Sequence, residues 1–229
     1  MRDAVTFDFG QVLASFDPAF LVEKLRERGE DGDVARFEAA LPVAWHAYGI
    51  ALREGGHGAG AWKTFLRTVL VEGGSPGAAK EDLLDWLFVD QKRRNLWQKP
   101  VEGMIDVVRD LRRRGVPVAI LSNSEGKLVE LVAKLGWTGD FPVIADSGVL
   151  GFEKPGRAIF EWTADRLGVA IDRLVHVGDS WAADVEGALG VGARAVWFPA
   201  ADERELDRSR VLPARSVDDV RRAIASFGT

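Results

Sequence analysis

Apolar positions along the chain fall into two patterns that predict different elements. Continuous apolar runs predict strands buried on both faces, at residues 3–7, 116–121, 142–145, 174–177 and 193–198. Amphipathic stretches predict helices at about residues 104–114, 122–135, 157–167, 179–189 and 217–227. Strands that alternate with helices in this way predict an α/β domain with a doubly wound, Rossmann-like parallel sheet and right-handed crossovers.

One long segment after the first predicted strand lacks this alternation. Between residues 15 and 98 the apolar residues recur at helical spacing, and glycine-rich breaks at 55–60 and 73–77 interrupt them. Residues 99–103 then read as a return linker. The pattern predicts a core domain of residues 1–14 and 99–229, with a helical domain of residues 15–98 inserted after the first strand.

Polar residues follow three of the predicted strands directly. Asp8 ends the first strand, Ser122 and Asn123 follow the second, and Asp179 follows the fourth. Each alone is typical of an Asx turn or a helix N-cap. Because the carboxyl ends of parallel strands meet at one edge, where ligands bind, we expect these side chains to lie close together.

Four short motifs in chain order carry a family resemblance. They are Asp8-Phe9-Gly10-Gln11-Val12-Leu13, Ser122-Asn123, Lys154-Pro155, and Gly178-Asp179 with Asp184. Their order, spacing and flanking structure resemble the haloacid dehalogenase-like (HAD) hydrolase superfamily along nearly the whole chain. The resemblance implies a HAD core, and it implies that the inserted helices form a cap of the C1 type that closes over the site.

The resemblance also implies a role in phosphoryl transfer for each polar residue. Asp8 corresponds to the nucleophile, which attacks phosphorus and forms an aspartyl-phosphate. Ser122 would bind a phosphate oxygen, and Asn123 would orient Asp8 or contact the substrate. Lys154 would balance the charge of Asp8 and of the transferring phosphoryl group.

A magnesium site is part of the same resemblance. Asp8, Asp179 and the backbone carbonyl of Gly10 would supply hard oxygen ligands, with Asp184 orienting the metal or its water. This set of few protein ligands suits Mg²⁺. We therefore expect the carboxylate oxygens of Asp8 and Asp179 to lie within roughly 5 Å of each other, given Mg–O lengths near 2.1 Å.

The first motif departs from the family pattern at two positions. Most HAD phosphatases carry a second Asp two residues after the nucleophile, which protonates the leaving group, and here that residue is Gly10. Val12 replaces a common Thr. Whether water, Asp17 or His46 substitutes for the missing acid is open. Residues flanking the glycine-rich break are the expected cap contacts with substrate: Trp45, His46, Tyr48, Arg53 and His57.

Composition narrows the function classes. The net charge is −5, and no dense Lys/Arg stretch exists beyond residues 112–114, which argues against a nucleic-acid partner. The absence of cysteine excludes disulfides, thiolate zinc sites and a cysteine nucleophile. No apolar run approaches the roughly 20 residues of a membrane span, and no signal peptide is visible, so we expect a cytoplasmic protein without membrane contact. The oligomeric state is open, a homodimer included.

Three activities are compatible with these residues. The leading hypothesis is a Mg²⁺-dependent phosphatase acting on a small phosphorylated metabolite. A 2-haloacid dehalogenase also uses the first Asp and lacks the second carboxylate, but its chemistry needs no metal, which leaves Asp179 without a role. The third reading is a phospho-ligand binding protein that lost catalysis with the acid missing at Gly10.

Overall fold

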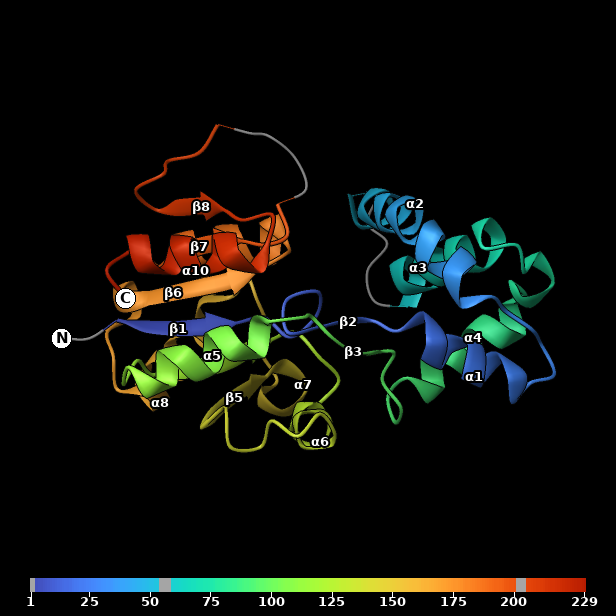
Figure 1. Ribbon diagram of the computed structural model, residues 1–229, viewed down its shortest axis with the longest axis horizontal. Helices are drawn as coiled ribbons and strands as arrows, with labels where there is room; N and C mark the ends of the chain where they lie inside the picture. Colours follow the sequence, from blue (N-terminus) through green and yellow to red (C-terminus); the bar gives the residue numbers. More distant parts are fainter. Residues whose placement is uncertain (1–2, 54–58, 201–204) are drawn as a thin grey trace. The chain divides into compact units, whose positions relative to one another are not determined.

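The computed structural model describes residues 3–53, 59–200 and 205–229 (Figure 1). The chain divides into two compact units, one of Met1–Phe16 with Trp97–Thr229 and the other of Asp17–Leu96. Each unit has its own core. None of the helices in the described ranges is both long enough and apolar enough to cross a membrane.

A six-stranded parallel sheet forms the centre of the first unit. Its strands lie in the order β5-β4-β1-β6-β7-β8. Their bounds are β1 Ala4–Phe7, β4 Val118–Ser122, β5 Val143–Asp146, β6 Leu174–Gly178, β7 Arg194–Trp197 and β8 Val211–Pro213. Strand β1 pairs in parallel with both β4 and β6, so it lies in the interior of the sheet. The predicted doubly wound parallel sheet is confirmed.

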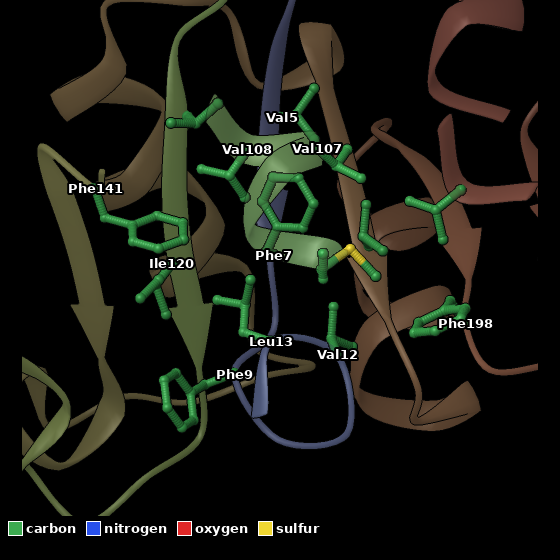
Figure 2. Packing of buried hydrophobic residues seen from close by; sticks show 14 of the residues in the cluster. Val5, Phe7, Phe9, Val12, Leu13, Val107, Val108, Ile120, Phe141 and Phe198 are labelled. Atoms are coloured by element: carbon green, nitrogen blue, oxygen red, sulfur yellow. The ribbon is translucent and has the colours of Figure 1, made fainter. Parts of the chain in front are cut away.

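Helices cover both faces of this sheet, and alternate residues of each strand divide between them. On one face, Val5 and Phe7 pack with the buried residues of α5 (Met104–Arg113), α6 (Leu128–Lys134) and α10 (Val217–Ser226). Figure 2 shows Phe7 in this cluster with Val107 and Val108 of α5. On the other face, Ala4 and Leu174 pack with α8 (Arg157–Leu167). Burial on both faces explains why the strands read as continuous apolar runs.

The helices next to the polar strand ends differ from the sequence expectation. The helix expected from about residue 122 begins only at Leu128, because Gly126 and Leu128 donate their N–H groups to the Asp146 carboxylate and Gly126 has a φ of +85°. The helix expected over 179–189 is a π-helix, Trp181–Glu186, followed by the short α9, Gly187–Gly190. Two further short helices are α7, Ser147–Leu150, and η2, Ile171–Arg173.

Three short strands escaped the sequence analysis. Strand β8 has three residues, too few for an apolar pattern to register. Strands β2 (Ala14–Phe16) and β3 (Trp97–Pro100) form an antiparallel ribbon where the chain leaves and re-enters the first unit. The segment expected as a linker from residue 99 is therefore partly a strand. Strand β3 begins before it and pairs Trp97 with Phe16.

The second unit is helical, as the spacing of its apolar residues predicts. Its helices are α1 Pro18–Arg26, α2 Val34–Arg53, α3 Ala59–Glu72, η1 Pro76–Ala78 and α4 Glu81–Asp90. Asp17 caps α1 by accepting a hydrogen bond from the Phe20 N–H at 3.1 Å. Lys24, with no exposed surface, forms an ion pair with Asp90 and so ties α1 to the end of α4.

Candidate active site

Asp8 lies at the carboxyl edge of the sheet, immediately after β1. Its N–H donates to the Val177 carbonyl of β6 at 2.8 Å, which extends the strand pairing up to the acidic residue. Ser122 is the last residue of β4, and Asp179 directly follows β6. Since β4 and β6 are the two neighbours of β1, all three residues reach the same short stretch of sheet edge.

Three carboxylates converge at this edge. Asp8, Asp179 and Asp184 each offer an oxygen, and these oxygens lie within 4.8 Å of one another. The distance is inside the roughly 5 Å limit that a shared small cation sets. Asp8 and Asp184 are buried, and Asp179 is half-buried. Within the described parts of the chain this is the one such cluster of acidic or histidine side chains.

Lys154 joins two of these carboxylates. Its ammonium Nζ lies 2.7 Å from Asp8 Oδ1 and 2.5 Å from Asp184 Oδ1, and it also donates to the Leu121 carbonyl at 3.0 Å. These contacts use all three ammonium protons. The residue is only 4% exposed. The sequence pointed to Lys154 through a motif, since a lysine in a loop is otherwise typical of solvated surface.

The loop that carries Lys154 is fixed by Asn123. The Asn123 amide donates to the Lys154 carbonyl at 3.0 Å, and its side-chain oxygen accepts from the Lys154 N–H at 2.8 Å. Both ends of the side chain therefore bind the backbone of Lys154. The expected role of Asn123, to orient Asp8 or to contact substrate, stays a prediction; in the structure its side chain clamps the backbone of the lysine loop.

Asp184 accepts hydrogen bonds from three different groups. Oδ1 faces Lys154 Nζ and His176 Nε2, the latter at 2.9 Å, and Oδ2 accepts from the Ser180 N–H at 2.9 Å. Gly178 permits this position, because a Cβ added there would lie 2.2 Å from Asp184 Cγ. His176 was not singled out from the sequence, where it reads as one residue of an apolar strand.

The charges of the site are unbalanced, and the pKa values reflect this. Burial would raise the pKa of Asp184, but Lys154 and His176 outweigh it and hold that pKa below the ordinary range. Burial also opposes the charge of Lys154, yet Asp184 and Asp8 raise the lysine pKa. Burial and the charge of Asp184 raise the pKa of Asp8 despite Lys154, and burial with both neighbouring carboxylates raises the pKa of Asp179 well above its usual value. One lysine cannot neutralise three carboxylates of which two are buried and one is half-buried, so the site favours an additional cation.

The loop after Ser122 is shaped by a residue that sequence reasoning missed. Asp146, at the end of β5, accepts from the Ser124 hydroxyl at 2.6 Å and from the N–H groups of Gly126, Leu128 and Gly148 at 3.0 Å. This carboxylate is buried and its hydrogen bonds hold the loop to the neighbouring strand. The only sequence signal was its position at a strand end, which it shares with Asp8.

Gly10 is not imposed by crowding. A Cβ at this position would lie 3.6 Å from Trp97 Cδ1 and 3.7 Å from Asp8 Oδ2, which are ordinary contact distances. The strained residue of the loop is its neighbour Gln11, with a φ of +60°. Position 10 would therefore accept a Cβ.

The expected cap contacts belong to the second unit. Trp45 and Tyr48 of α2 both pack against Phe65, with ring centroids 4.2 Å and 6.3 Å away, so they contribute to the bundle core. His46 is exposed on the same helix. The side chain of Arg53 and the whole of His57 lie outside the described residues.

Comparison with known proteins agrees with this arrangement. The family model of haloacid dehalogenase-like hydrolases matches residues 3–192. Haloacid dehalogenase-like hydrolase domain-containing protein 3 of Mus musculus is 30% identical over 164 residues, which are 68% of this chain and 64% of that protein. The phosphoserine phosphatase of Thermus thermophilus is 30% identical over 166 residues, which are 69% and 64% of the two chains. The chain thus matches a little less than two thirds of the length of these relatives.

A solved structure shares the fold. It is the magnesium-bound crystal structure of YfnB of Bacillus subtilis, described as a HAD-hydrolase, which superposes with a TM-score of 0.69 at 18% identity over 96% of each chain. The family match over residues 3–192 shows that the chain belongs to the haloacid dehalogenase-like hydrolases.

Substitution of Gly178 tests whether Asp184 must lie where it does. We expect Gly178→Ala to displace Asp184 and, with it, the contact to Lys154, because the new methyl group cannot fit. A displacement of about 1 Å in an active site can reduce turnover on the order of 10²-fold. The control is Gly190→Ala in α9, where a Cβ meets nothing within 4 Å. Equal activity of the two variants would contradict the expectation.

Proposed function

We propose that this protein is a Mg²⁺-dependent phosphatase that hydrolyses a small phosphorylated metabolite through an aspartyl-phosphate on Asp8. The observation that carries the proposal is the cluster of Asp8, Asp179 and Asp184 around the single ammonium of Lys154 at the sheet edge. Carboxylates this close together lower the stability of the fold, because burying like charges is costly, so a structural role alone does not explain them. The name of the Thermus relative, a phosphoserine phosphatase, supports the same reaction class.

The donor set fits a magnesium ion. Three carboxylates with oxygens within 4.8 Å of one another supply the hard ligands that this ion prefers, and the raised pKa values of Asp8 and Asp179 mark a place short of positive charge. Asp184 already accepts hydrogen bonds on both oxygens, so Asp8 and Asp179 would bind the ion directly, with the Gly10 carbonyl beside them. When bound, the ion neutralises charge on the phosphoryl oxygens and on the carboxylates.

The residues of the chain then divide the work. Lys154 holds Asp8 Oδ1 and so orients the carboxylate, which attacks phosphorus as the bond to the leaving oxygen breaks. Ser122 lowers the pKa of Asp8 and, at the end of β4, would also reach a phosphate oxygen. Water then cleaves the acyl phosphate, which releases inorganic phosphate and restores Asp8. Asn123 and Asp184 keep Lys154 in place throughout.

The substrate class follows from Gly10. No acid at this position can protonate the departing oxygen, and general acid catalysis contributes about 10²–10⁴-fold, or roughly 3–5 kcal/mol of barrier. The reaction is therefore best served by leaving groups of low pKa, such as those of sugar 1-phosphates, acyl phosphates or aryl phosphates. We propose that the helical unit of Asp17–Leu96 acts as the cap that selects among them.

The dehalogenase alternative makes a different use of the site. Displacement of halide from carbon needs Asp8 but no metal, so it gives no role to Asp179 and its strongly raised pKa. Chloride release from 2-chloropropionate in EDTA would favour the dehalogenase. Turnover of p-nitrophenyl phosphate that requires Mg²⁺ would favour the phosphatase, and intact esters across a broad panel would favour a phospho-ligand binding protein.

Removal of the nucleophile is the first test. We expect Asp8→Asn to lower the turnover of p-nitrophenyl phosphate on the order of 10³-fold or more, because the amide cannot form the acyl phosphate. The fold should persist in the circular dichroism spectrum. Asp165→Asn on the exposed side of α8 is the matched control and should keep full activity. Near-wild-type rates for Asp8→Asn would rule out the mechanism.

The magnesium site is tested by titration. We expect Asp179→Asn to raise the Mg²⁺ concentration for half-maximal activity at least about tenfold, since it removes one carboxylate from the cluster. The measurement is initial rate against Mg²⁺ after EDTA treatment. Unchanged Mg²⁺ dependence in this variant would show that Asp179 does not bind the ion.

The role of Gly10 is tested by comparing leaving groups. We expect the wild-type rate to fall steeply as the leaving-group pKa rises from aryl to alkyl phosphates. Gly10→Asp should raise turnover of an alkyl phosphate by about 10²-fold while changing the aryl phosphate little, because the added acid helps only a poor leaving group. Gly10→Ala has the same Cβ without the acid and serves as the control. An equal response of both esters to Gly10→Asp would argue against the assignment.

A further inference from the structure

His176 is a buried histidine in the middle of β6 that the proposed reaction does not use directly. It has no exposed surface, and both ring nitrogens have partners. Nδ1 lies 2.8 Å from the Thr6 hydroxyl, and Nε2 lies 2.9 Å from Asp184 Oδ1. Thr6 and His176 face each other across the β1–β6 pair, so the sheet register itself fixes the first contact.

The contacts determine where the imidazole proton lies. Asp184 is also bound by the Lys154 ammonium, and a carboxylate held in this way can only accept hydrogen bonds. Nε2 must therefore carry the proton and donate it. Nδ1 is hydrogen-bonded to the Thr6 hydroxyl, 2.8 Å away. The Thr6 hydroxyl and both ring nitrogens of His176 therefore have hydrogen-bond partners inside the protein.

A structural role alone would not require a histidine here. Every residue of β6 is buried, and the face that holds Thr6 and His176 packs against α8, where the ring of Phe160 lies edge-on to the imidazole at 5.6 Å. An aliphatic side chain would fill such a place without the cost of burying an imidazole and a hydroxyl. The Thr6–His176 pair is therefore better explained by the contact of His176 with Asp184.

The residue that His176 contacts, Asp184, also binds Lys154. Asp184 Oδ1 receives both His176 Nε2 and Lys154 Nζ, and the same ammonium contacts Asp8 Oδ1 at 2.7 Å. The hydrogen bonds thus run without a break from Thr6 in β1 through His176, Asp184 and Lys154 to Asp8. Rotation of the Asp184 carboxylate would move the ammonium, and His176 is the donor inside the sheet that opposes this rotation.

We propose that His176 is a positioning residue, which fixes the Asp184 carboxylate so that Lys154 stays against the nucleophile Asp8. The inference rests on the proposed phosphatase function. Because Lys154 acts on the group being transferred, loss of the His176 contact should lower kcat much more than it changes KM.

Two amide variants separate the two ring contacts. In His176→Gln the amide nitrogen reaches the place of Nε2 and can donate to Asp184. In His176→Asn the shorter amide reaches the place of Nδ1, beside Thr6, and the donor to Asp184 is lost. Both variants lose the aromatic ring and its contact with Phe160, so they are matched in packing.

The expected result is a split between these variants. We expect His176→Asn to lower kcat about 10- to 100-fold, as loss of a hydrogen bond that orients a site ligand typically does, with KM changed less than about twofold. His176→Gln should recover most of that loss. An equal fall in both, or no fall in either, would show that the ring only fills space, and would overturn the inference.

A second pair covers the case in which His176→Asn does not fold. Thr6→Val removes the hydroxyl at nearly constant volume, and Thr6→Ser keeps it. We expect a lower kcat for Thr6→Val with recovery in Thr6→Ser, because only the hydroxyl sets the orientation of the imidazole. If the two Thr6 variants have equal kcat, the inference is overturned.

A measurement without turnover keeps this inference separate from the proposed function. In ¹⁵N-histidine-labelled, metal-free protein, we expect the His176 ring to carry a proton on Nε2, hydrogen-bonded to Asp184. Protonation at Nδ1 alone would overturn the inference even in an active phosphatase. Conversely, a protein inactive on every phosphate ester with the expected Nε2–H signal would refute the phosphatase while leaving the hydrogen-bonded chain in place.

Discussion

The site depends on one buried ammonium group shared by two carboxylates. Lys154 Nζ contacts Asp8 and Asp184 with almost no access to water, so its charge acts at low dielectric and is worth far more there than at the surface. Removal of any partner would leave a buried charge without compensation. This constraint explains why neighbouring groups are devoted to holding the lysine, with Asn123 on its backbone and the Leu121 carbonyl on its ammonium.

The parallel sheet makes this concentration of charge possible. Strand β1 lies between β4 and β6, and all three end at the same edge, so residues far apart in sequence meet without long connections. Apolar residues bury the strands on both faces. This burial stabilises the sheet and offsets the free-energy cost of the polar groups at its edge. Hydrogen bonds fix the segments beyond that edge: Asp146 accepts from the loop after β4, and Ser180 caps the π-helix after β6.

Family membership and chemistry are separable in this chain. The chain has the haloacid dehalogenase-like fold and a cluster of three carboxylates, and residue 10 is glycine. Contact distances around Gly10 are ordinary, so the glycine reflects no steric demand of the loop. At position 10 the chain therefore has no carboxylate that could protonate a leaving group.

The sequence by itself predicted the parallel sheet, most of its strands and helices in chain order, and the polar residues that directly follow three of its strands. Apolar runs of this length have few alternatives to buried strands. A polar residue directly after such a strand, such as Asp8 or Asp179, lies at the carboxyl edge of the sheet. Strands β2 and β8 were missed because three residues carry too little pattern, and β3 was missed because Trp97–Pro100 is half-buried or exposed and forms no apolar run. Only the tertiary structure decided the partners. His176 and Asp146 look like ordinary strand residues until hydrogen bonds across 8 to 22 positions reveal Asp184 and Ser124 opposite them, because the direction of a side chain is set by packing and strand register rather than by local sequence.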